Sequence, residues 1–375
     1  MTETILFLQS SAERYGSDRQ LLALASGIDQ RRFTPVAVLP ERGELAAMLE
    51  DAGVETVVAD LAILRRAELG PRQAWRMLRT ETSQLEALAR DRAAALVHSN
   101  TSVIVSGQRL ADRVGVPHVL HVREIYPHIP LAWPLWRRRM LRADRLLCVS
   151  HAVAAQFRGS ERVAVVHDGL PRAPGRADRA AARAMVGLDP ETYAVAVLGR
   201  VSAWKGQDVL ARALAEPPLA SIGAVGLVAG TAWPGAERPL AELERLREEL
   251  GLGERLLTLG FEDDVATLLG AVDAVAVPSK RPDPFPNAAL EAAAAGVPVV
   301  AAAHGGLPEM LRDGQTGVLV EPNDPLALAS ALRALADEPG RARTIGAAAA
   351  ADVAARFSAE RMLAAVQAEY DALLG

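Results

Sequence analysis

Short apolar runs alternate with longer stretches of helical periodicity from one end of the chain to the other, and this alternation constrains the fold most. In the first half, the runs that predict strands are 4–9, 34–40, 55–60, 95–100, 117–122, 145–150 and 162–169. In the second half they are 193–200, 224–230, 255–261, 273–279, 297–303 and 317–322. Strands separated by helices predict βαβ units and parallel sheets. We therefore expect doubly wound α/β domains, in which ligands bind beyond the carboxyl ends of the strands.

One segment breaks this rhythm and divides the chain. Residues 171–192 are rich in Pro, Gly, Arg and Ala, and a chain of 375 residues exceeds one typical hydrophobic core. We predict an N-terminal Rossmann-like domain at 1–170 and an interdomain region with one short helix at 171–192. A second Rossmann-like domain is predicted at 193–356. The helix at 357–375 is predicted to pack back on the first domain.

Charge and cysteine content exclude several classes of protein. The net charge of −5 provides no excess of cations for a general nucleic-acid binder. The single cysteine, Cys148, cannot form an internal disulfide and reads as a small buried residue. No window approaches 18 uninterrupted apolar residues, and the N-terminal segment reads as a buried strand rather than a signal peptide. These features predict a cytoplasmic protein without a transmembrane segment.

Familiar cofactor motifs are absent from the sequence. There is no GxxxxGK[ST] of a P-loop, no GxGxxG after a strand, and neither HExxH nor CxxC. We therefore do not predict a P-loop phosphoryl transferase, a nicotinamide or flavin enzyme, or a protein-bound metal.

Two cations lie at and just beyond the end of the run 193–200. Arg200 ends that run, and Lys205 follows five residues later, directly before Gly206. An Arg that donates hydrogen bonds to two oxygens at once and a Lys that acts as a point charge suit a diphosphate. The alternative is a pair of solvated surface charges, and the spacing alone does not decide between these two interpretations.

The segment SKRPDPFPNAALEAAAAGVPVVAAAHGG, residues 279–306, carries two acids eight positions apart. Prolines stiffen the loop around Asp283, and Pro286 suits the first turn of a helix. The amides of residues 287–289 would then point out of that helix start towards an anion. Glu291 lies one turn further on, where it could accept from ribose hydroxyls. The alternatives are a turn residue for Asp283 and a favourable first-turn acid for Glu291.

Together these patterns resemble glycosyltransferase family 4. The resemblance rests on Arg200-x4-Lys205-Gly206, on the acid-x7-Glu291 pair and on GGLPEMLRDGQTGVLVEPND at 305–324. It runs over nearly the whole chain and is most specific in the C-terminal half. The family consists of retaining, nucleotide-sugar-dependent enzymes with two facing Rossmann-like domains (the GT-B architecture) and a cleft between them.

The resemblance implies a role for each of the following residues. The donor diphosphate would be bound by Gly16, Arg200, Lys205, Asn287 and Ala288. The donor sugar would contact Asp283, Phe285 and Pro286, near the loop 304–306, and the nucleoside would contact Glu291 and Phe261. The catalytic residues would be His121 and Asp283, although a lone histidine at a strand end is more often structural.

The chain departs from the family pattern beside these positions. Asp283 stands where the family usually has Glu, and Pro284 and Pro286 replace the two glycines of Gly-Phe-Gly. Tyr15-Gly16 replaces two adjacent glycines. Each proline removes one backbone donor, which leaves the identity of the sugar open.

The first half supplies fewer specific signals. Arg123 and Glu124 follow His121 and are candidates for an acceptor or cleft site, as is Trp133. The aromatic and basic segment 128–141 reads as an amphipathic helix with a solvated basic face, as an acceptor pocket, or as a peripheral contact with the inner membrane surface.

The resemblance predicts transfer of a sugar from a nucleotide sugar, most simply a UDP-sugar, to an acceptor hydroxyl without a further cofactor. A sugar-nucleotide epimerase of the same architecture and a non-catalytic nucleotide-sugar-binding protein are the alternatives.

Overall fold

The computed structural model describes residues 2–64, 82–126, 132–233, 235–260 and 264–375. It separates into two compact units. The first comprises Met1–Pro171 together with Ser358–Gly375, and the second comprises Arg172–Phe357. The short helix α8 (Arg179–Met185) lies at the start of the second unit, inside the segment that breaks the strand rhythm.

The first unit is built on a seven-stranded parallel sheet of order β3-β2-β1-β4-β5-β6-β7. Its strands are β1 Glu3–Leu8, β2 Phe33–Leu39, β3 Glu55–Val58, β4 Ala94–Ser99, β5 His118–Val122, β6 Arg145–Cys148 and β7 Val163–Val165. Its helices are α1 Gly16–Gly27, α2 Glu44–Asp51, α4 Ser83–Asp91, α5 Ser106–Val114, α6 Trp133–Met140, α7 His151–Ala154, the 3-10 turn η2 Ala155–Phe157 and α17 Ala359–Leu374.

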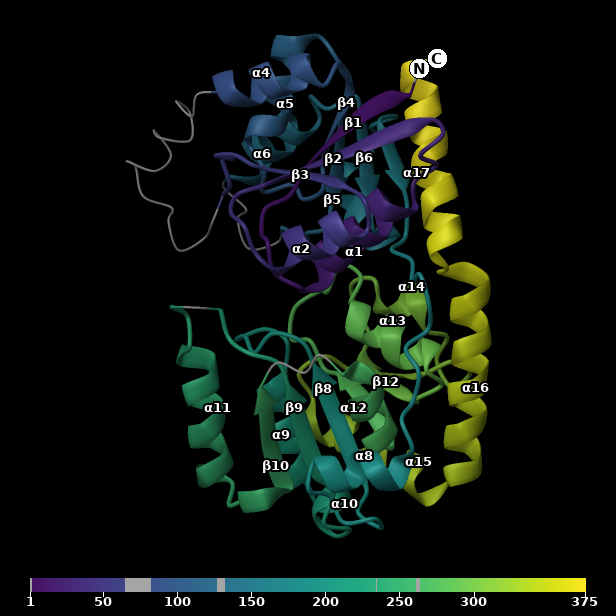
Figure 1. Cartoon of the computed structure of the whole chain (residues 1–375). Helices are drawn as coiled ribbons and strands as arrows, with labels where there is room; N and C mark the ends of the chain where they lie inside the picture. The colour runs from purple at the N-terminus through teal and green to yellow at the C-terminus, as the bar shows by residue number, and fades with distance from the viewer. Residues whose placement is uncertain (1, 65–81, 127–131, 234, 261–263) are drawn as a thin grey trace. The chain divides into compact units, whose positions relative to one another are not determined.

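The last helix completes this unit. The Oγ atom of Ser358 accepts from the amide of Arg361 and caps α17, which lies beside α1 (Figure 1). Its apolar residues join those of α1 and α2 in the core on one face of the sheet, whereas α4 and α5 cover the other face. Tyr370 is fully buried, and its hydroxyl bonds to Nδ1 of His98 on β4.

The second unit repeats the plan with a six-stranded parallel sheet of order β10-β9-β8-β11-β12-β13. Its strands are β8 Ala194–Leu198, β9 Val225–Ala229, β10 Leu256–Gly260, β11 Ala274–Val277, β12 Val299–Ala302 and β13 Val318–Val320. Besides α8, its helices are α9 Gln207–Ala215, α10 Pro217–Ala220, α11 Arg238–Glu249, the 3-10 turn η3 Gly253–Arg255, α12 Val265–Ala271, α13 Asn287–Ala294, α14 Leu307–Met310, α15 Pro325–Asp337 and α16 Pro339–Arg356.

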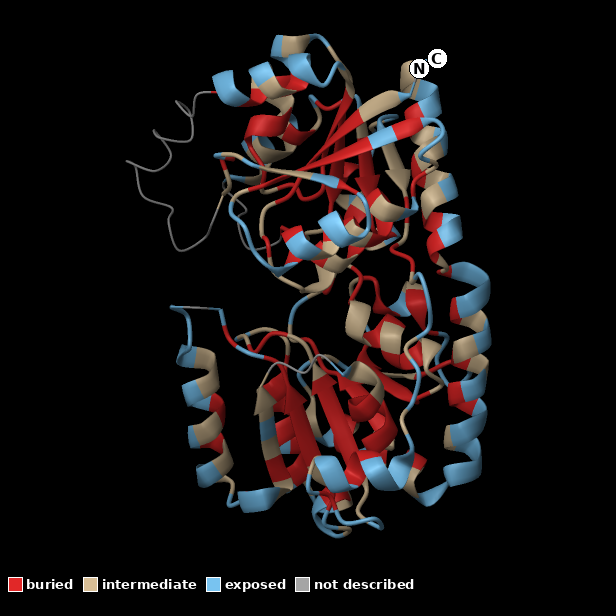
Figure 2. Cartoon of the chain, in the orientation of Figure 1, coloured by how far each residue is buried: buried red, intermediate tan, exposed pale blue. Residues whose placement is uncertain are grey.

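Apolar runs explain why these segments are central strands. Residues of β8, β11 and β12 are almost entirely buried, as parallel strands covered by helices on both faces must be (Figure 2). Apolar residues of α9, α10, α11, α15 and α16 form the core on one face of this sheet. On the other side, α13 packs against β11 and β12.

Each predicted run overlaps one observed strand, and the prediction of parallel α/β sheets is confirmed. Several strands end before the predicted run does. β7 stops at Val165, and Asp168, further along the predicted run, forms an ion pair with Arg123. Among the described residues, no helix is long and apolar enough to cross a membrane.

In both sheets the chain reverses its winding direction at one pair of central strands. This switch point lies between β1 and β4 in the first unit and between β8 and β11 in the second. Ligands of this fold class bind in the crevice outside the carboxyl ends of such strands. Many of the predicted site residues follow these strands.

Candidate functional site

The loops after β8 and β11 lie side by side at the switch point of the second unit. The amide of Lys280 donates to the carbonyl of Trp204 at 2.7 Å, which joins the two loops. The loop after β8 carries Arg200 and Lys205, and the loop after β11 carries Asp283. The fold therefore brings together cations and an acid that are about eighty residues apart in the sequence.

Lys205 and Asp283 form a direct ion pair. The Nζ atom of Lys205 lies 2.7 Å from Oδ2 of Asp283, and the Oγ atom of Ser279 donates to the same oxygen at 3.2 Å. The carboxylate is nearly buried, with 5% of its side chain exposed, whereas 26% of the lysine side chain is exposed. The ammonium group has three donors, so the pair with Asp283 leaves capacity for a further anion.

Arg200 lies at the end of β8 and is 9% exposed. Its guanidinium carbon lies 3.3 Å from the centroid of the Trp233 ring, and its carbonyl accepts from Nε2 of Gln207 on α9. Burial lowers the pKa of Arg200 to about 10, so the group is still charged at neutral pH. A cation fixed at a strand end suits a phosphate oxygen.

Helix α13 begins one residue later than the sequence indicated. Pro286 is extended and precedes the helix, and Asn287 and Ala288 supply the first amides of α13. The amide of Ala289, expected to point outwards, donates to the carbonyl of Pro286 at 3.1 Å and is therefore not available to an anion. Glu291 stands one turn into α13 and is partly exposed.

Phe285 is turned into the core of the second unit. Its ring meets that of Phe357 edge to face, with centroids 5.3 Å apart, and 6% of the residue is exposed. A contact from Phe285 to a bound sugar would therefore come from its backbone. Phe261, predicted to contact the nucleoside, lies outside the described residues.

The loop after β12 packs against the acid-bearing loop, as expected for 304–306. The amide of Gly306 donates to the carbonyl of Asp283 at 2.8 Å, and Nε2 of His304 lies 2.7 Å from the carbonyl of Ser279. Backbones that approach this closely leave no room for a side chain at the glycines. The position of Asp283 is thus set by three loops.

His121 lies in the first unit, on β5. It is fully buried, and among the described residues neither of its ring nitrogens has a hydrogen-bond partner. Its ring lies 5.5 Å from that of His98. Burial is the main reason that the pKa of His121 lies well below its usual value, and the charge of Arg123 lowers it further. A neutral buried imidazole with two unused polar atoms is costly, which marks it as a candidate for function.

Arg123 is held inside the first unit. Its Nη1 atom lies 2.5 Å from Oδ1 of Asp168, and its Nε atom donates to the carbonyl of Asn100 at 3.0 Å. Glu124 accepts from the hydroxyl and the amide of Ser102, and burial raises the pKa of its carboxyl group. The structure therefore gives both side chains partners within this unit.

Trp133 and Gly16 begin two different helices of the first unit. Trp133 is the first residue of α6, and its ring stacks on Tyr126 with centroids 5.5 Å apart. Gly16 is the first residue of α1, next to a buried carboxyl group, Asp18. Asp18 accepts from Nε2 of Gln9 and from Oγ of Ser11, and burial raises its pKa.

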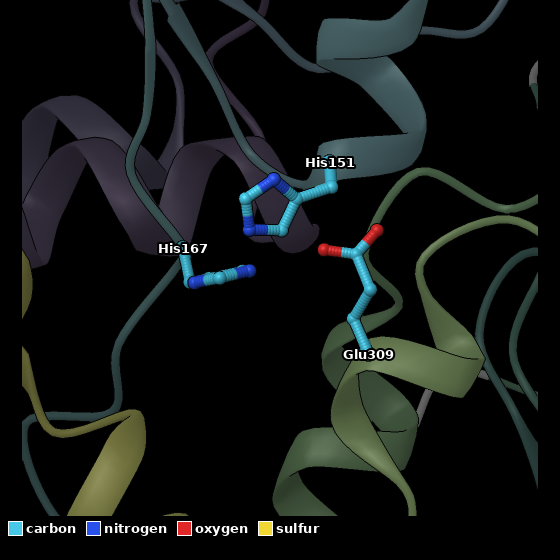
Figure 3. Close-up of side chains that lie close together, drawn as sticks. All are labelled: His151, His167 and Glu309. Atoms are coloured by element: carbon cyan, nitrogen blue, oxygen red, sulfur yellow. The ribbon is translucent and has the colours of Figure 1, made fainter.

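Figure 3 shows His151 at the start of α7 and His167 on the segment after β7, two residues of the first unit whose ring centroids lie 5.9 Å apart. The third residue drawn there, Glu309, belongs to α14 of the second unit. Two imidazoles are fewer than the three or four protein ligands of a zinc site, so the pair in the first unit does not by itself make one.

Two family models match consecutive parts of the chain. The model described as "Glycosyltransferase Family 4" matches residues 15–173, and the model described as "Glycosyl transferases group 1" matches residues 178–352. Structures of Anabaena HepE in complex with UDP-glucose and with UDP and glucose are 25% identical to this chain, with TM-scores of 0.86 and 0.85. The first match covers 99% of this chain and 100% of HepE, and the second covers 98% and 99%.

A curated relative is more similar in sequence. The D-inositol 3-phosphate glycosyltransferase of Mycobacterium tuberculosis is 38% identical over 310 residues, which cover 78% of this chain. The match spans 60% of the length of that relative. The fold is that of the GT-B glycosyltransferases. With both family models matched, the chain belongs to glycosyltransferase family 4.

Two residues of the second unit contact the predicted site residues but are not themselves predicted from the sequence. Trp233 covers Arg200, and Ser279 donates to Asp283. A tryptophan four residues beyond a strand that is expected to end at the binding edge was an available signal, since exposed tryptophans are uncommon. Ser279 carried no comparable signal in the sequence.

Proposed function

We propose that this protein is a retaining glycosyltransferase that transfers a hexosyl group from a nucleoside diphosphate sugar, most simply a UDP-sugar, to an acceptor hydroxyl. The observation that carries the proposal is the cluster of Arg200, Lys205, Asp283 and the start of α13 at the switch point of the second unit. HepE, whose structures are complexes with UDP-glucose and with UDP and glucose, supports a UDP donor.

The cluster suits a leaving diphosphate. As the bond between the anomeric carbon and the phosphate oxygen breaks, negative charge grows on that oxygen. Arg200 and Lys205 would stabilise this charge, together with the amides at the start of α13. Arg200 presents a planar fork, whereas Lys205 supplies a mobile ammonium that is already positioned by Asp283.

The acceptor attacks the anomeric carbon from the face that the diphosphate leaves. A bond forms between the acceptor oxygen and that carbon, and the departing phosphate oxygen takes the proton of the acceptor hydroxyl. The products are the glycoside, with its anomeric configuration retained, and the nucleoside diphosphate. In this proposal His121 and Asp283 orient the sugar, and Glu291 accepts from the ribose hydroxyls.

Nucleotide-sugar binding is tested first by thermal shift with UDP-, GDP-, ADP- and dTDP-sugars. A ligand that binds only the folded protein raises its stability by RT ln(1 + [L]/Kd). The sugar nucleotide with one particular base should therefore give a clearly larger thermal shift than the other three. The shift should disappear in R200A and in K205A. It should persist in R312A, which removes an exposed ion pair with Asp352 of similar length in the same unit. Equal responses to all four bases would contradict the proposal.

Transfer is tested next with the donor that binds. Acceptors to assay are a lipid-linked glycan, a polysaccharide end, a small natural product and D-inositol 3-phosphate. The last compound gives the Mycobacterium tuberculosis relative its name. NMR of the product should show the anomeric configuration of the donor. An inverted product would contradict retention. Conversion of the donor without an acceptor would indicate an epimerase, and binding without any turnover would indicate a nucleotide-sugar sensor.

A further inference from the structure

Trp233 lies on the loop after β9 and covers the cation at the end of β8. About half of the tryptophan (49%) is exposed, which is unusual for an indole, yet its ring centroid lies 3.3 Å from the guanidinium carbon of Arg200. Arg200 itself is 9% exposed. The indole is thus half in solvent, and its ring stands over the nearly buried guanidinium of Arg200.

The separation fixes how the two groups are oriented. If the guanidinium stood on its edge with its carbon 3.3 Å from the ring centroid, at least one of its nitrogens would lie well inside van der Waals contact with the ring. The two planes therefore lie face to face. Stacking uses the flat faces of the guanidinium, whereas its N–H donors lie in its plane and point sideways. The contact thus restrains Arg200 without using the donors that a diphosphate would bind.

Backbone pairing carries Trp233 to this position. The amide of Gly199, just past β8, donates to the carbonyl of Ala229 at the end of β9 at 2.9 Å, and the amide of Val201 donates to the carbonyl of Thr231 at 3.0 Å, so the two segments stay paired past the strands. A Cβ atom on Gly230 would lie 2.0 Å from the carbonyl oxygen of Gly199. Only glycine permits this approach, which places the residues after β9 directly beside Arg200.

Further hydrogen bonds hold the backbone near Trp233. The amide of Ala236 donates to the carbonyl of Trp233 at 2.9 Å, and the amide of Gly235 donates to Oε1 of Glu237 at 2.7 Å. Glu237 directly precedes α11, so the turn is anchored to the start of that helix. The carbonyl of Trp233 and the amides of Gly235 and Ala236 therefore have defined partners.

We propose that Trp233 is a positioning residue of the donor site, which holds the plane of Arg200 so that its N–H donors face the donor diphosphate. The inference rests on the proposed function, because it takes Arg200 as a diphosphate ligand. It adds a residue from a third loop, the one after β9, to the loops after β8 and β11.

Calorimetric titration with UDP tests this role. Removal of the ring in W233A should weaken UDP binding by about 3- to 30-fold, the range spanned by cation–π contacts from exposed to desolvated sites. W233L, which keeps bulk but has no π face, should behave like W233A. W233F keeps a ring and should stay within about threefold of wild type. Uridine lacks the diphosphate, so its affinity should be unchanged in all three variants.

Two controls separate positioning from a general structural effect. In an R200K background the guanidinium plane is absent, so W233A should weaken UDP binding further by about twofold or less. L326A removes another half-exposed apolar side chain (52%) of the same unit, at the start of α15, and should leave UDP binding unchanged.

The outcomes distinguish this inference from the proposed function. If wild type binds UDP and both W233A and W233L bind it as tightly as wild type does, the positioning role is wrong and the proposed function stands. The same holds if W233A weakens uridine as much as UDP, or if the full loss persists in R200K. If wild type binds no nucleoside diphosphate, both proposals fall.

Discussion

At the scale of single residues, Lys205 and Asp283 are coupled, because the carboxylate is nearly buried and the ammonium is its ionic partner. K205A leaves that carboxylate without its counter-ion and should lower the free energy of unfolding of the second unit by about 2 to 3 kcal/mol. The double variant K205A/D283N should be more stable than K205A, because the buried charge has gone. Urea unfolding monitored by circular dichroism measures both variants. A double variant as unstable as the sum of the two single ones would show that the residues are not coupled.

The sequence predicts this pair only in part. Strand-end position and the spacing to Glu291 singled out Lys205 and Asp283, but each was assigned to a different part of the donor. Their contact depends on the side-by-side course of the loops after β8 and β11, and that course follows from strand order. Strand order is a property of the whole sheet, so periodicity along the chain does not determine it.

At the scale of elements, the loop after β12 holds the loop that carries Asp283. A Cβ atom on Gly305, whose φ is +64°, would lie 2.2 Å from the carbonyl oxygen of Asp283. Gly314 has a similar φ of +68° but has no atom within 4 Å of such a Cβ among the described residues. G314A should therefore cost about 1 kcal/mol of stability from backbone strain alone. G305A should cost at least about 3 kcal/mol, because backbone must also move.

The same pair of variants separates strain from displacement of the site. Because G305A must shift Asp283, we expect it to reduce donor-induced thermal stabilisation, whereas G314A should leave that stabilisation unchanged. Equal losses of stability in the two variants, measured by urea unfolding, would show that the loop adjusts without moving the acid.

The strands of this molecule are easier to predict from the sequence than its loops are. Central strands such as β8 and β11 are nearly continuous apolar runs because helices cover both faces of the sheet, and that composition is visible in the sequence. The loops were less predictable. Trp233 reaches Arg200 only because backbone pairing continues past β8 and β9, and no local pattern in the sequence signals that continuation.

At the scale of the whole molecule, the first unit is closed by a helix that is distant in sequence. Tyr370 on α17 reaches across to His98 on β4, and the ring of His98 lies beside His121 on β5. The composition of 357–375 predicts an amphipathic helix. Its partner strand follows only from the finished fold, since the contact joins residues 272 positions apart.

Burial of histidines couples the stability of this unit to pH. Burial lowers the pKa values of His98 and His121 well below the usual pKa of histidine. It lowers the pKa of His118 to about 3. As the pH falls below about 6.5, these histidines bind protons in the unfolded chain but stay neutral in the folded unit. The free energy of unfolding is therefore highest above that pH and is lost as the pH falls. Burial raises the pKa of acids such as Asp18, which act in the opposite direction.

His121 gives the sharpest test, because comparison of one variant with wild type cancels the contribution of the acids. H121L removes a buried imidazole whose ring nitrogens have no partner among the described residues, so it should cost little stability at pH 7. Between pH 7 and pH 5.5 its stability relative to wild type should rise by about 1.2 kcal/mol, the linkage expected for one histidine that stays neutral when folded.

His118, on the same strand, is the matched control. Its ring nitrogens lie 2.9 Å from Oγ of Ser99 and from Oε1 of Gln108, so H118L should gain the same pH dependence but lose about 1 to 3 kcal/mol at pH 7. If His121 orients the transferred sugar, H121L should abolish transfer while it stabilises the protein in acid. A variant that keeps full transfer would leave His121 a structural residue, and one without the pH-dependent gain would show that its imidazole is not buried.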